Sequence, residues 1–326
     1  MLDPDLAAVR RAVRLATADL PGGALVLVAC SGGADSLALL AGACFELPHA
    51  GRRCGAVVVD HGLQPGSADV AKRAAAQARG MGADPVQVAT AVVSGGGGPE
   101  AAARTARYAA LRAVADDHAA ASVLLAHTRE DQAETVLLGL ARGSGARSLA
   151  GMRPVDGLWR RPLLGLPRDS VRRACAAAGQ DAWDDPHNDD PAYTRARVRS
   201  RVLPVVEAEL GPGVTAALAR TADLLRDDAD LLDALAEPLA RHLVPAGSDL
   251  HVDCRAVAAE PAALRRRVLL GAARRTGCPP TDLTAAHVHA LDALVTGTHG
   301  GHGIDLPGGV RARRRGSVLV IGPSRA

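Results

Sequence analysis

"VACSGGADSLALL", residues Val28 to Leu40, places a short polar turn between two apolar runs. The run before it, "ALVLVA", has the continuous aliphatic character of a buried strand, and "SLALLAGA" after it begins a helix. Glycine-containing turns between a strand and a helix are where α/β proteins hold phosphates, because backbone N–H groups at the helix start face the anion. The stretch therefore predicts a phosphate site in an α/β fold.

The chemistry of this turn differs from that of a Walker-A loop, which needs a lysine for the β and γ phosphates. Lys72 is the only lysine in the chain, and it lies in "VAKRAAAQ" with no glycine loop before it. The turn at Ser31 instead offers hydroxyl and backbone N–H groups, which are better suited to holding a pyrophosphate leaving group. This favours cleavage between the α and β phosphates, as in adenylation. The alternative is a serine-glycine turn in which Asp35 only caps the helix.

Strand-like segments of aliphatic residues alternate with helical patterns through the first half of the chain. This alternation predicts an α/β fold with a doubly wound, mainly parallel sheet covered by helices on both faces. Ligands of such sheets bind at the carboxyl ends of the strands. The expected strands are "ALVLVA" (24–29), "GAVVVDHGL" (55–63), "DPVQVATAVV" (84–93) and "SVLLAH" (122–127). The polar or glycine residues at their ends are Ser31, Asp60, His61, Gly62, Ser94, Gly95 and His127.

The pattern of the remaining chain is different. The expected elements are a long helix over 213–243 that bends at Pro238, helices near 261–276 and 282–296, and three strands in the closing stretch "GIDLPGGVRARRRGSVLVIG". We therefore expect a nucleotide-binding catalytic domain over residues 1–212. Residues 213–326 should form a helical linker and a smaller α+β domain.

Composition restricts the class of protein. The chain has 326 residues, enough for two ordinary domains, and only 2% aromatic residues, so its cores must be built from Ala, Val and Leu. All of its 38 basic residues except Lys72 are arginines, which suit bidentate contact with phosphates. The net charge of +3 permits nucleic-acid binding without requiring it.

Cysteine usage and the N-terminus indicate a location. The six cysteines are scattered with no CxxC pair, which argues against a zinc ribbon or a thiol relay and indicates reduced thiols. The start, "MLDPDLAAVRRAVRLATADL", is an amphipathic helix pattern without the apolar region of a signal peptide. No run reaches the ~18 apolar residues of a membrane span. We expect a cytoplasmic protein that does not enter a membrane.

The turn "SGGADS" resembles the SGGxDS loop of the PP-loop ATP pyrophosphatase superfamily at every fixed position. Further stretches, in the same order, resemble blocks of the tRNA(Ile)-lysidine synthetase family. They are "VVVDHGL" (57–63), "EAAARTARY" (100–108), "AHTREDQAETVLLGLARGSG" (126–145), "RRPLL" (160–164), "DDPHNDDPAYTRARVRSRVLP" (184–204) and "DLPGG" (305–309). Six blocks in order are a specific signal, although residues 215–300 match only in helical character.

The resemblance implies a reaction, its cofactors and its partners. The family uses ATP and Mg²⁺ to adenylate C2 of the wobble cytidine in a CAU-anticodon isoleucine tRNA, with release of pyrophosphate. L-lysine then displaces AMP to give lysidine, and the tRNA changes from methionine to isoleucine identity. Adenylation makes chemical sense, because the oxygen at C2 of cytosine is a poor leaving group. The smaller C-terminal domain would then bind tRNA, and the oligomeric state, a dimer included, stays open.

The resemblance and the strand ends together predict the nucleotide site. Asp35, at the start of the helix, can hold a Mg²⁺ that bridges phosphates. Asp60 and His61 end the second strand, where adenine or ribose would sit; the alternative is an ordinary polar strand end. The expected nucleotide-binding residues are Ser31, Gly32, Gly33, Ala34, Asp35, Ser36, Asp60 and His61.

Two further groups complete the expected catalytic residues. Arg104 and Arg107 lie at i, i+3 on one helix and can clamp a phosphate or the cytidine oxygen, unless they are simply solvated. His127 ends a strand, and Asp131 and Glu134 follow on one face of the next helix. Two carboxylates there can hold Mg²⁺, for which Asp131 is the second expected ligand, or a lysine ammonium. Acids that only complement the helix dipole are the alternative.

The stretch "YTRARVRSR" predicts the tRNA contact. A helix would present its arginines as two stripes, more than one ion-paired face needs, which suggests contact with the RNA backbone. These arginines are Arg195, Arg197, Arg199 and Arg201. The sequence departs from the family at Thr128, often histidine, at Glu130, often aspartate, and at Ala196, commonly asparagine. Roles for those positions are therefore in doubt.

Other functions remain possible from the sequence. Another PP-loop enzyme is one, such as a tRNA thiolase, which would need reactive cysteine pairs, or an amidotransferase-linked synthetase, which would need a nucleophilic cysteine. An inert RNA-binding or ATP-sensing module is another. The convergence of polar residues on one sheet edge disfavours the inert module.

Overall fold

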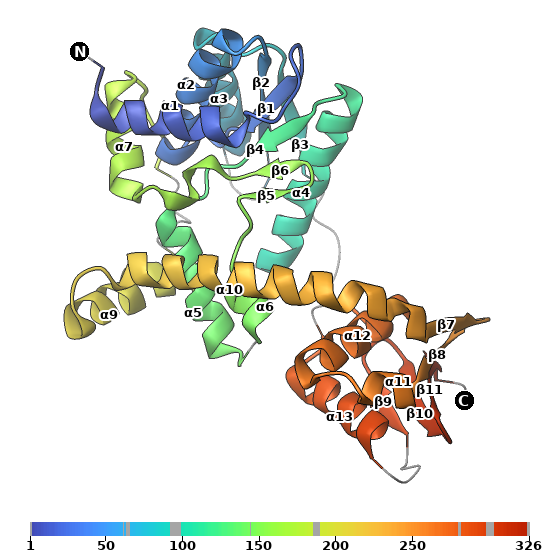
Figure 1. The fold of residues 1–326 in the computed structure, drawn as a ribbon. Coiled ribbons are helices and arrows are strands. Elements are labelled where there is room, and N and C mark those ends of the chain that lie inside the picture. Colours follow the sequence, from blue (N-terminus) through green and yellow to red (C-terminus); the bar gives the residue numbers. More distant parts are fainter. Residues whose placement is uncertain are drawn as a thin grey trace. The chain divides into compact units, whose positions relative to one another are not determined.

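The computed structural model describes most of the chain, in two compact units. The described residues are 2–60, 62, 66–91, 99–143, 145–184, 190–279, 282–297 and 303–324. The first unit comprises Met1–Leu137 and Gly151–Arg220, and the second comprises Leu138–Ala150 and Thr221–Ala326 (Figure 1). The domain boundary expected after residue 212 stays a prediction.

A six-stranded sheet forms the centre of the first unit. Its strands are β1 (Leu25–Ala29), β2 (Arg53–Asp60), β3 (Val86–Thr90), β4 (Ser122–Leu124), β5 (Val155–Asp156) and β6 (Trp159–Arg160). They lie in the order β3-β2-β1-β4-β6-β5, and all neighbours are parallel except β5 and β6. The predicted doubly wound, mainly parallel α/β sheet is confirmed. The strand order reverses at β1, which lies between β2 and β4, so the carboxyl ends of these strands border the expected ligand crevice.

Helices cover both faces of this sheet. They are α1 (Pro4–Ala16), α2 (Ala34–His49), α3 (Ser67–Gly80), α4 (Pro99–Asp117), the 3₁₀ segment η1 (Pro162–Gly165) and α7 (Arg168–Ala177). Helix α5 (Arg129–Ala141) follows β4, and α6 (Ala146–Leu149) belongs to the second unit. Side chains alternate along β1, so Val26 and Val28 pack with α1, α2, α3 and α7. Leu25 and Leu27 face the other way and pack with α4.

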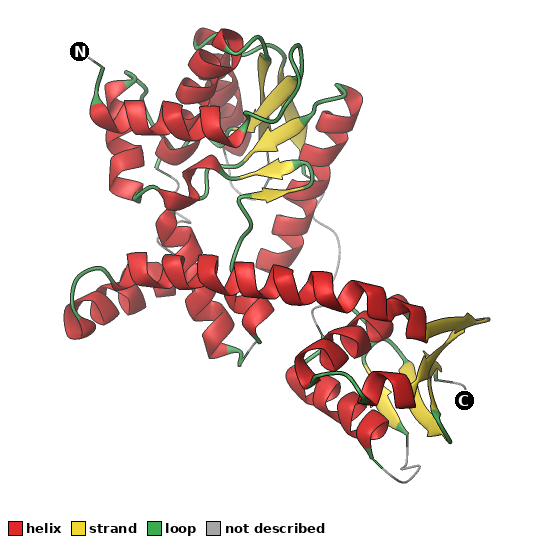
Figure 2. Cartoon of the chain, in the orientation of Figure 1, coloured by secondary structure: helices red, strands yellow, loops and turns green. Residues whose placement is uncertain are grey.

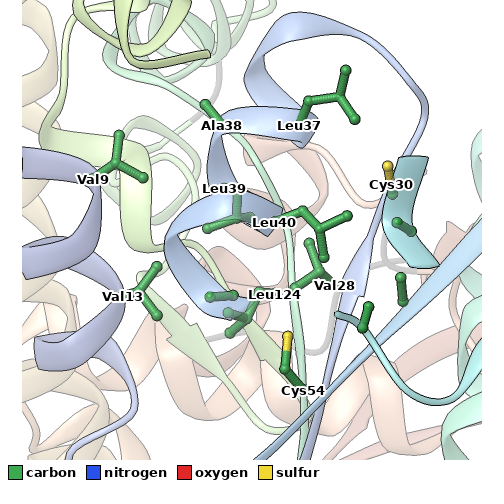
Figure 3. Packing of buried hydrophobic residues seen from close by; sticks show 14 of the residues in the cluster. Val9, Val13, Val28, Cys30, Leu37, Ala38, Leu39, Leu40, Cys54 and Leu124 are labelled. Atoms are coloured by element: carbon green, nitrogen blue, oxygen red, sulfur yellow. The ribbon is translucent and has the colours of Figure 1, made fainter. Parts of the chain in front are cut away.

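Helix α1 packs closely against α2, which carries the glycine-containing turn at its start. Val9 and Val13 of α1 are fully buried in one cluster with Leu39 and Leu40 of α2 (Figure 3). Gly42 of α2 permits the close approach, since a Cβ atom there would lie 2.9 Å from Cγ1 of Val9. The aliphatic core expected from the composition thus fixes α2 and the turn that precedes it.

A run of helical segments follows residue 190. They are α8 (Thr194–Arg197), the π-helical segment η3 (Val198–Val202), α9 (Leu203–Leu210), α10 (Val214–Ala236) and the 3₁₀ segment η4 (Glu237–His242). The α-helical hydrogen bonding of α10 ends just before Pro238, which lacks an N–H donor, and a 3₁₀ segment follows; the predicted bend at Pro238 stays a prediction. In the described part of the chain, no helix alone has the length and composition to cross a membrane; Thr194–Leu210 and Val214–His242 meet that test only as a bent pair.

The second unit has an antiparallel sheet in the order β7-β8-β11-β10-β9. Figure 2 shows this sheet with the helices of the same unit. Its elements are β7 (Leu243–Ala246), β8 (Asp249–Asp253), α11 (Cys254–Ala258), α12 (Ala262–Arg275), α13 (Ala285–Thr296), β9 (Ile304–Leu306), β10 (Val310–Arg315) and β11 (Val318–Pro323). The three closing strands and the two longer helices are where the sequence predicts them, and the hairpin of β7 and β8 was not predicted. Leu269, Leu291 and Leu319 are fully buried between helices and sheet.

Candidate active site

The turn after β1 is organised by the side chain of Ser36. Its Oγ atom donates to the carbonyl oxygen of Gly33 at 2.9 Å, accepts from the N–H group of Ser31 at 3.1 Å and lies 3.2 Å from the Ser31 Oγ atom. Gly32 has φ +83°, and a Cβ atom there would lie 3.2 Å from Cβ of Ala74. Glycine is therefore required at this position. The strand–turn–helix geometry expected from the sequence is present.

The start of α2 has the features of an anion site. Gly33 is its N-cap residue, and no side chain among the described residues caps the first turn. The backbone N–H groups of Ala34 and Asp35 therefore keep their donors for a ligand, and the dipole of a 16-residue helix favours an anion there.

Asp35 lies in the first turn of α2 with an incompletely paired carboxylate. Its Oδ1 atom is buried without a hydrogen-bond partner in the described structure, and its Oδ2 atom lies 3.5 Å from Nε of Arg168. Burial raises the pKa of Asp35 to about 6, although Arg168 opposes this shift. A buried carboxylate oxygen without a partner, beside free N–H groups, fits a cation that bridges to phosphates.

Across the crevice, the start of α5 holds two buried carboxylates. Thr128 precedes the helix, and its N–H and hydroxyl groups both donate to Oδ2 of Asp131, at 2.7 and 2.9 Å. This is half of a capping box, so Thr128 has a structural role where the family often has histidine. Glu134 follows one turn later and is fully buried.

Two arginines bind these carboxylates. Arg168, the first residue of α7, lies with Nη2 2.8 Å from Oδ1 of Asp131 and Nη1 3.7 Å from Oε1 of Glu134. Arg199, in the π-helical segment, lies with Nε 2.7 Å from Oε1 of Glu134 and Nη2 3.1 Å from Oδ1 of Asp131. Because Arg168 also approaches Asp35, the three acids form one group, which we call the carboxylate cluster: Asp35, Asp131 and Glu134.

The members of the carboxylate cluster differ in acidity. Burial opposes ionisation of Asp131, but Arg168, the N–H group of Thr128 and Arg199 outweigh it, and its pKa falls to about 2. Burial raises the pKa of Glu134, and Arg199 only partly offsets this. Asp131 is therefore firmly ionised, whereas Glu134 and Asp35 become protonated more easily.

His127 follows β4 and precedes Thr128 at the start of α5. Its Nδ1 atom is buried without a hydrogen-bond partner among the described residues. Burial lowers the pKa of His127 to about 3; Asp131 opposes the shift, and Arg107, Arg161 and Arg104 add to it. The imidazole is therefore neutral at pH 7. Burial also lowers the pKa of Arg107, with Arg104 adding to that shift. The predicted clamp by Arg104 and Arg107 stays a prediction.

Asp60 ends β2, as predicted, and its Oδ1 atom accepts a hydrogen bond from the N–H group of Gly62 at 3.0 Å. This contact closes the turn after the strand, while the carboxylate remains half-buried. His61, Ser94 and Gly95 lie outside the described residues.

The four arginines of the stretch 195–201 have different surroundings. Arg195 and Arg199 both contact α5, and Arg195 donates to Oγ1 of Thr135 at 3.4 Å. Arg197 donates to the carbonyl oxygens of residues 191 and 192, at 2.7 and 2.9 Å, whereas Arg201 is exposed. A shared RNA-binding role stays a prediction, and the ion pairs of Arg199 do not favour it for that residue.

Sequence reasoning missed Arg168, which contacts the whole carboxylate cluster. The only local signal is an arginine directly after Pro167. Its partners are distant in the chain: Glu134 is 34 residues earlier (168 − 134) and Asp131 is 37 residues earlier. Only the fold reveals these contacts.

Comparisons with known proteins agree with this geometry. Residues 7–206 match the family model of the PP-loop domain, and residues 253–319 match that of the TilS substrate binding domain. The U34-tRNA thiolase NcsA from Methanococcus maripaludis shares the fold of 68% of this chain and 80% of its own, with a TM-score of 0.57 and 17% identity.

Curated relatives match over nearly the full length. The chain is 55% identical to the tRNA(Ile)-lysidine synthase of Thermobifida fusca over 98% of both chains. It is 53% identical to the enzyme of that name from Streptomyces coelicolor, over 93% of this chain and 86% of the relative. In agreement with the resemblance carried by its motifs, the chain belongs to the tRNA(Ile)-lysidine synthase family of PP-loop proteins.

Proposed function

We propose that this chain is a ligase that joins L-lysine to C2 of the wobble cytidine in a CAU-anticodon isoleucine tRNA. Its family membership supports this activity, with ATP as the nucleotide. In the first step the C2 oxygen attacks the α phosphorus of ATP, and the bond to the bridging oxygen breaks with release of pyrophosphate. In the second step a lysine amine attacks C2 and loses a proton to water, and AMP leaves with the former C2 oxygen.

One observation carries the proposal: the guanidinium of Arg168 lies 3.5 Å from Asp35 and 2.8 Å from Asp131. A phosphate-binding turn and an amine-binding pair of carboxylates are therefore within the reach of one side chain. A reaction that first consumes a phosphoanhydride and then accepts an amine needs these two half-sites side by side.

The turn would hold the triphosphate of ATP. The backbone N–H groups of Gly33, Ala34 and Asp35, with the hydroxyl of Ser31, would donate to phosphate oxygens, and Asp60 would face the adenine or ribose. Asp35 is the residue we propose as the ligand of Mg²⁺, which when bound would neutralise charge on the departing pyrophosphate. Mg²⁺ sites commonly use one or two carboxylates with phosphates and water, so Asp35 alone suffices on the protein side.

Asp131 is less suited to a metal than expected from its position. Its Oδ1 atom is shared by Arg168 and Arg199, and its Oδ2 atom is taken by Thr128. We propose Asp131 as a second ligand of Mg²⁺ only for the state in which a bound substrate has displaced one of its two arginine partners. Glu134 is the better partner of a lysine ammonium, since a cation entering there would replace Arg199.

His127 and the arginines near it would position the cytidine. A base with a pKa of about 3 is too weak to remove a proton at neutral pH, so His127 would act as a hydrogen-bond partner through its unpaired nitrogen. Arg107 and the exposed Arg104 would contact phosphate or the cytidine oxygen. Arg195, Arg197 and Arg201 would contact the tRNA backbone together with the second unit. For the oligomeric state we propose a dimer.

The thiolase alternative lacks support from the cysteines. Cys44 and Cys54 have Sγ atoms 3.6 Å apart, but Cys54 stands at the beginning of β2, whereas the site lies at the carboxyl end of that strand. Cys30 and Cys175 belong to the core, and burial raises the pKa of both, that of Cys175 to about 11. Protonated, buried thiols are poor nucleophiles.

The test is to incubate the protein with ATP, a CAU-anticodon isoleucine tRNA transcript and lysine. We expect AMP and pyrophosphate in equal amounts, and lysidine in the tRNA. Formation of ADP, or of AMP without modified tRNA, would contradict the proposed function. A transcript with a GAU anticodon serves as the control and should yield neither product.

A further inference from the structure

We propose that Arg168 is a positioning residue that sets the spacing of Asp35 and Glu134 and supplies the charge that both half-sites share. This inference rests on the proposed function. It begins with geometry: the three guanidinium nitrogens approach three different carboxylates, Nη2 to Asp131 at 2.8 Å, Nε to Asp35 at 3.5 Å and Nη1 to Glu134 at 3.7 Å. The side chain is 11% exposed.

The backbone of Arg168 is fixed by residues at the start of α5. Its N–H group donates to Oε2 of Glu130 at 2.8 Å. The N–H group of Arg129 donates to the carbonyl of Leu166 at 3.0 Å, and its side chain donates to the carbonyl of Gly165 at 2.6 Å. Arg129 and Glu130, just before Asp131, thus hold the start of α7. Glu130, which stands where the family often has aspartate, therefore has a structural role.

The shape of arginine matters for this arrangement. A planar guanidinium directs donors along several fixed directions, whereas a lysine ammonium is a compact point charge. Lysine at position 168 would supply the positive charge but could not approach three carboxylates from one place. The two properties of Arg168, charge and shape, can therefore be separated by substitution.

The charge balance of the cluster is incomplete even with Arg168 present. Three carboxylates face two guanidiniums, those of Arg168 and Arg199. Removal of Arg168 would leave a second uncompensated negative charge in a buried place. The repulsion between Asp35 and Glu134 would no longer be offset, so their spacing would change.

The experiment compares Arg168→Ala, Arg168→Lys and the wild type in single-turnover assays at pH 8 over a range of lysine concentrations, following adenylate and lysidine separately. Arg173→Ala is the matched control, because Arg173 is on the same helix but lies at the surface, where it pairs with Asp5. Loss of a hydrogen bond to a charged group changes a rate or an affinity by roughly tenfold or more. Because Arg168 contacts both half-sites, we expect Arg168→Ala to slow adenylate formation about tenfold and to raise KM for lysine about tenfold.

The lysine variant separates charge from shape. Arg168→Lys keeps the charge, so it should restore most of the rate of adenylate formation, yet KM for lysine should stay raised several-fold. Arg173→Ala should match the wild type in both. An equal loss by both Arg168 variants in both steps, or no loss at all, would overturn the proposal.

A measurement without substrates separates this inference from the proposed function. Urea unfolding at pH 8 of Arg168→Ala, Glu134→Gln and the double variant measures their free energies of unfolding. Because Arg168 offsets the charge of Glu134, the double variant should lose less stability than the sum of the two single changes. If the wild type forms no AMP with the tRNA, the proposed function fails and this unfolding result alone decides on Arg168. Additive losses would overturn the inference.

Discussion

Arg199 Nε lies 2.7 Å from Oε1 of Glu134, a side chain that is fully excluded from solvent. The pair joins the π-helical segment η3 to α5 across 65 residues of chain. A buried carboxylate with one bidentate arginine partner is a stable ion pair only while that partner stays. A lysine substrate that binds Glu134 must therefore displace or share Arg199, and this exchange underlies the first two predictions.

Glu134→Gln should impair lysine use most. The change keeps the shape and removes the charge, and a contact with a charged group is worth about 1.5–3 kcal/mol, which converts to roughly 10- to 150-fold in KM for lysine. Adenylation should persist, and AMP-tRNA should accumulate when lysine is withheld. A single-turnover assay that resolves adenylate and lysidine measures both.

Asp131→Asn provides the contrast for that experiment. Asp131 holds Thr128 and both arginines, so its loss should damage both steps. If Glu134→Gln blocks adenylate formation while lysine dependence is unchanged, Glu134 belongs to the nucleotide half-site instead.

Arg199→Ala and Arg201→Ala should separate ion pairing from RNA contact. Arg201 is exposed, and each lost phosphate contact lowers the log–log salt slope of binding by about 0.7–0.9, so Arg201→Ala should flatten the slope. Arg199→Ala should leave the slope unchanged and alter KM for lysine. Filter binding of tRNA at several salt concentrations measures the slopes. A slope reduced equally by both changes would place Arg199 on the RNA.

The parts of the fold that follow from local pattern could be predicted. Aliphatic runs and the turns that bound them indicated β1 to β4, and Pro238 indicated the end of α10, because these signals act over a few residues. The strands β5 and β6 have two residues each, too short for any periodicity. β6 pairs with β4, whose Val123 lies opposite Trp159 and is 36 residues earlier in the chain (159 − 123), and β5 pairs only with β6.

The candidate site shows the same division. Strand ends and helix starts indicated Ser31, Asp35 and Asp131, since the sheet topology brings such positions together. Arg168 and the pairing of Arg199 could not be predicted, because arginine is nearly the only basic residue in this chain and its pattern carries little information. The π-helical turn at Val198–Val202 also changes which side chains share a face of the helix, and the helix propensities of its residues did not predict it.

Gly42→Ala should destabilise the first unit although alanine is the better helix former. A Cβ atom at this position would lie 2.9 Å from Cγ1 of Val9, which is fully buried and cannot move freely. Overpacking of a core costs about 1–3 kcal/mol, against a gain of up to about 1 kcal/mol from helix propensity. Urea unfolding monitored by circular dichroism measures the net change.

Gly271→Ala is the control for that substitution. Gly271 lies inside α12 with nothing within 4 Å of the added atom, so alanine there should stabilise the second unit. Equal stabilisation by both changes would show that α1 and α2 are less tightly packed than the contact of Gly42 with Val9 implies.

Asp35→Asn should abolish AMP formation and yet stabilise the protein above pH 6. The folded-state pKa of Asp35 is about 6 and its ordinary value is 3.8, so folding favours the protonated form. Below pH 3.8 both states are protonated and Asp35 carries no penalty; the penalty grows as the pH rises to about 6 and is constant above it. With Asp35 28% exposed, we expect asparagine to recover about 1–3 kcal/mol at pH 8 and little at pH 4.

Urea unfolding of wild type and Asp35→Asn at pH 4, 6 and 8 tests this trade between stability and activity. Asp69→Asn is the matched control, because Asp69 is 78% exposed on α3 and its loss should change stability little at any pH. The functional arm is AMP release at pH 8, which the asparagine cannot support if the carboxylate binds Mg²⁺. Either of two results would show that Asp35 does not bind the metal: adenylation of tRNA by the variant at the wild-type rate, or a lower stability of the variant than of the wild type at pH 8. A buried charge that costs stability is retained only where a cation bound with the substrate compensates it.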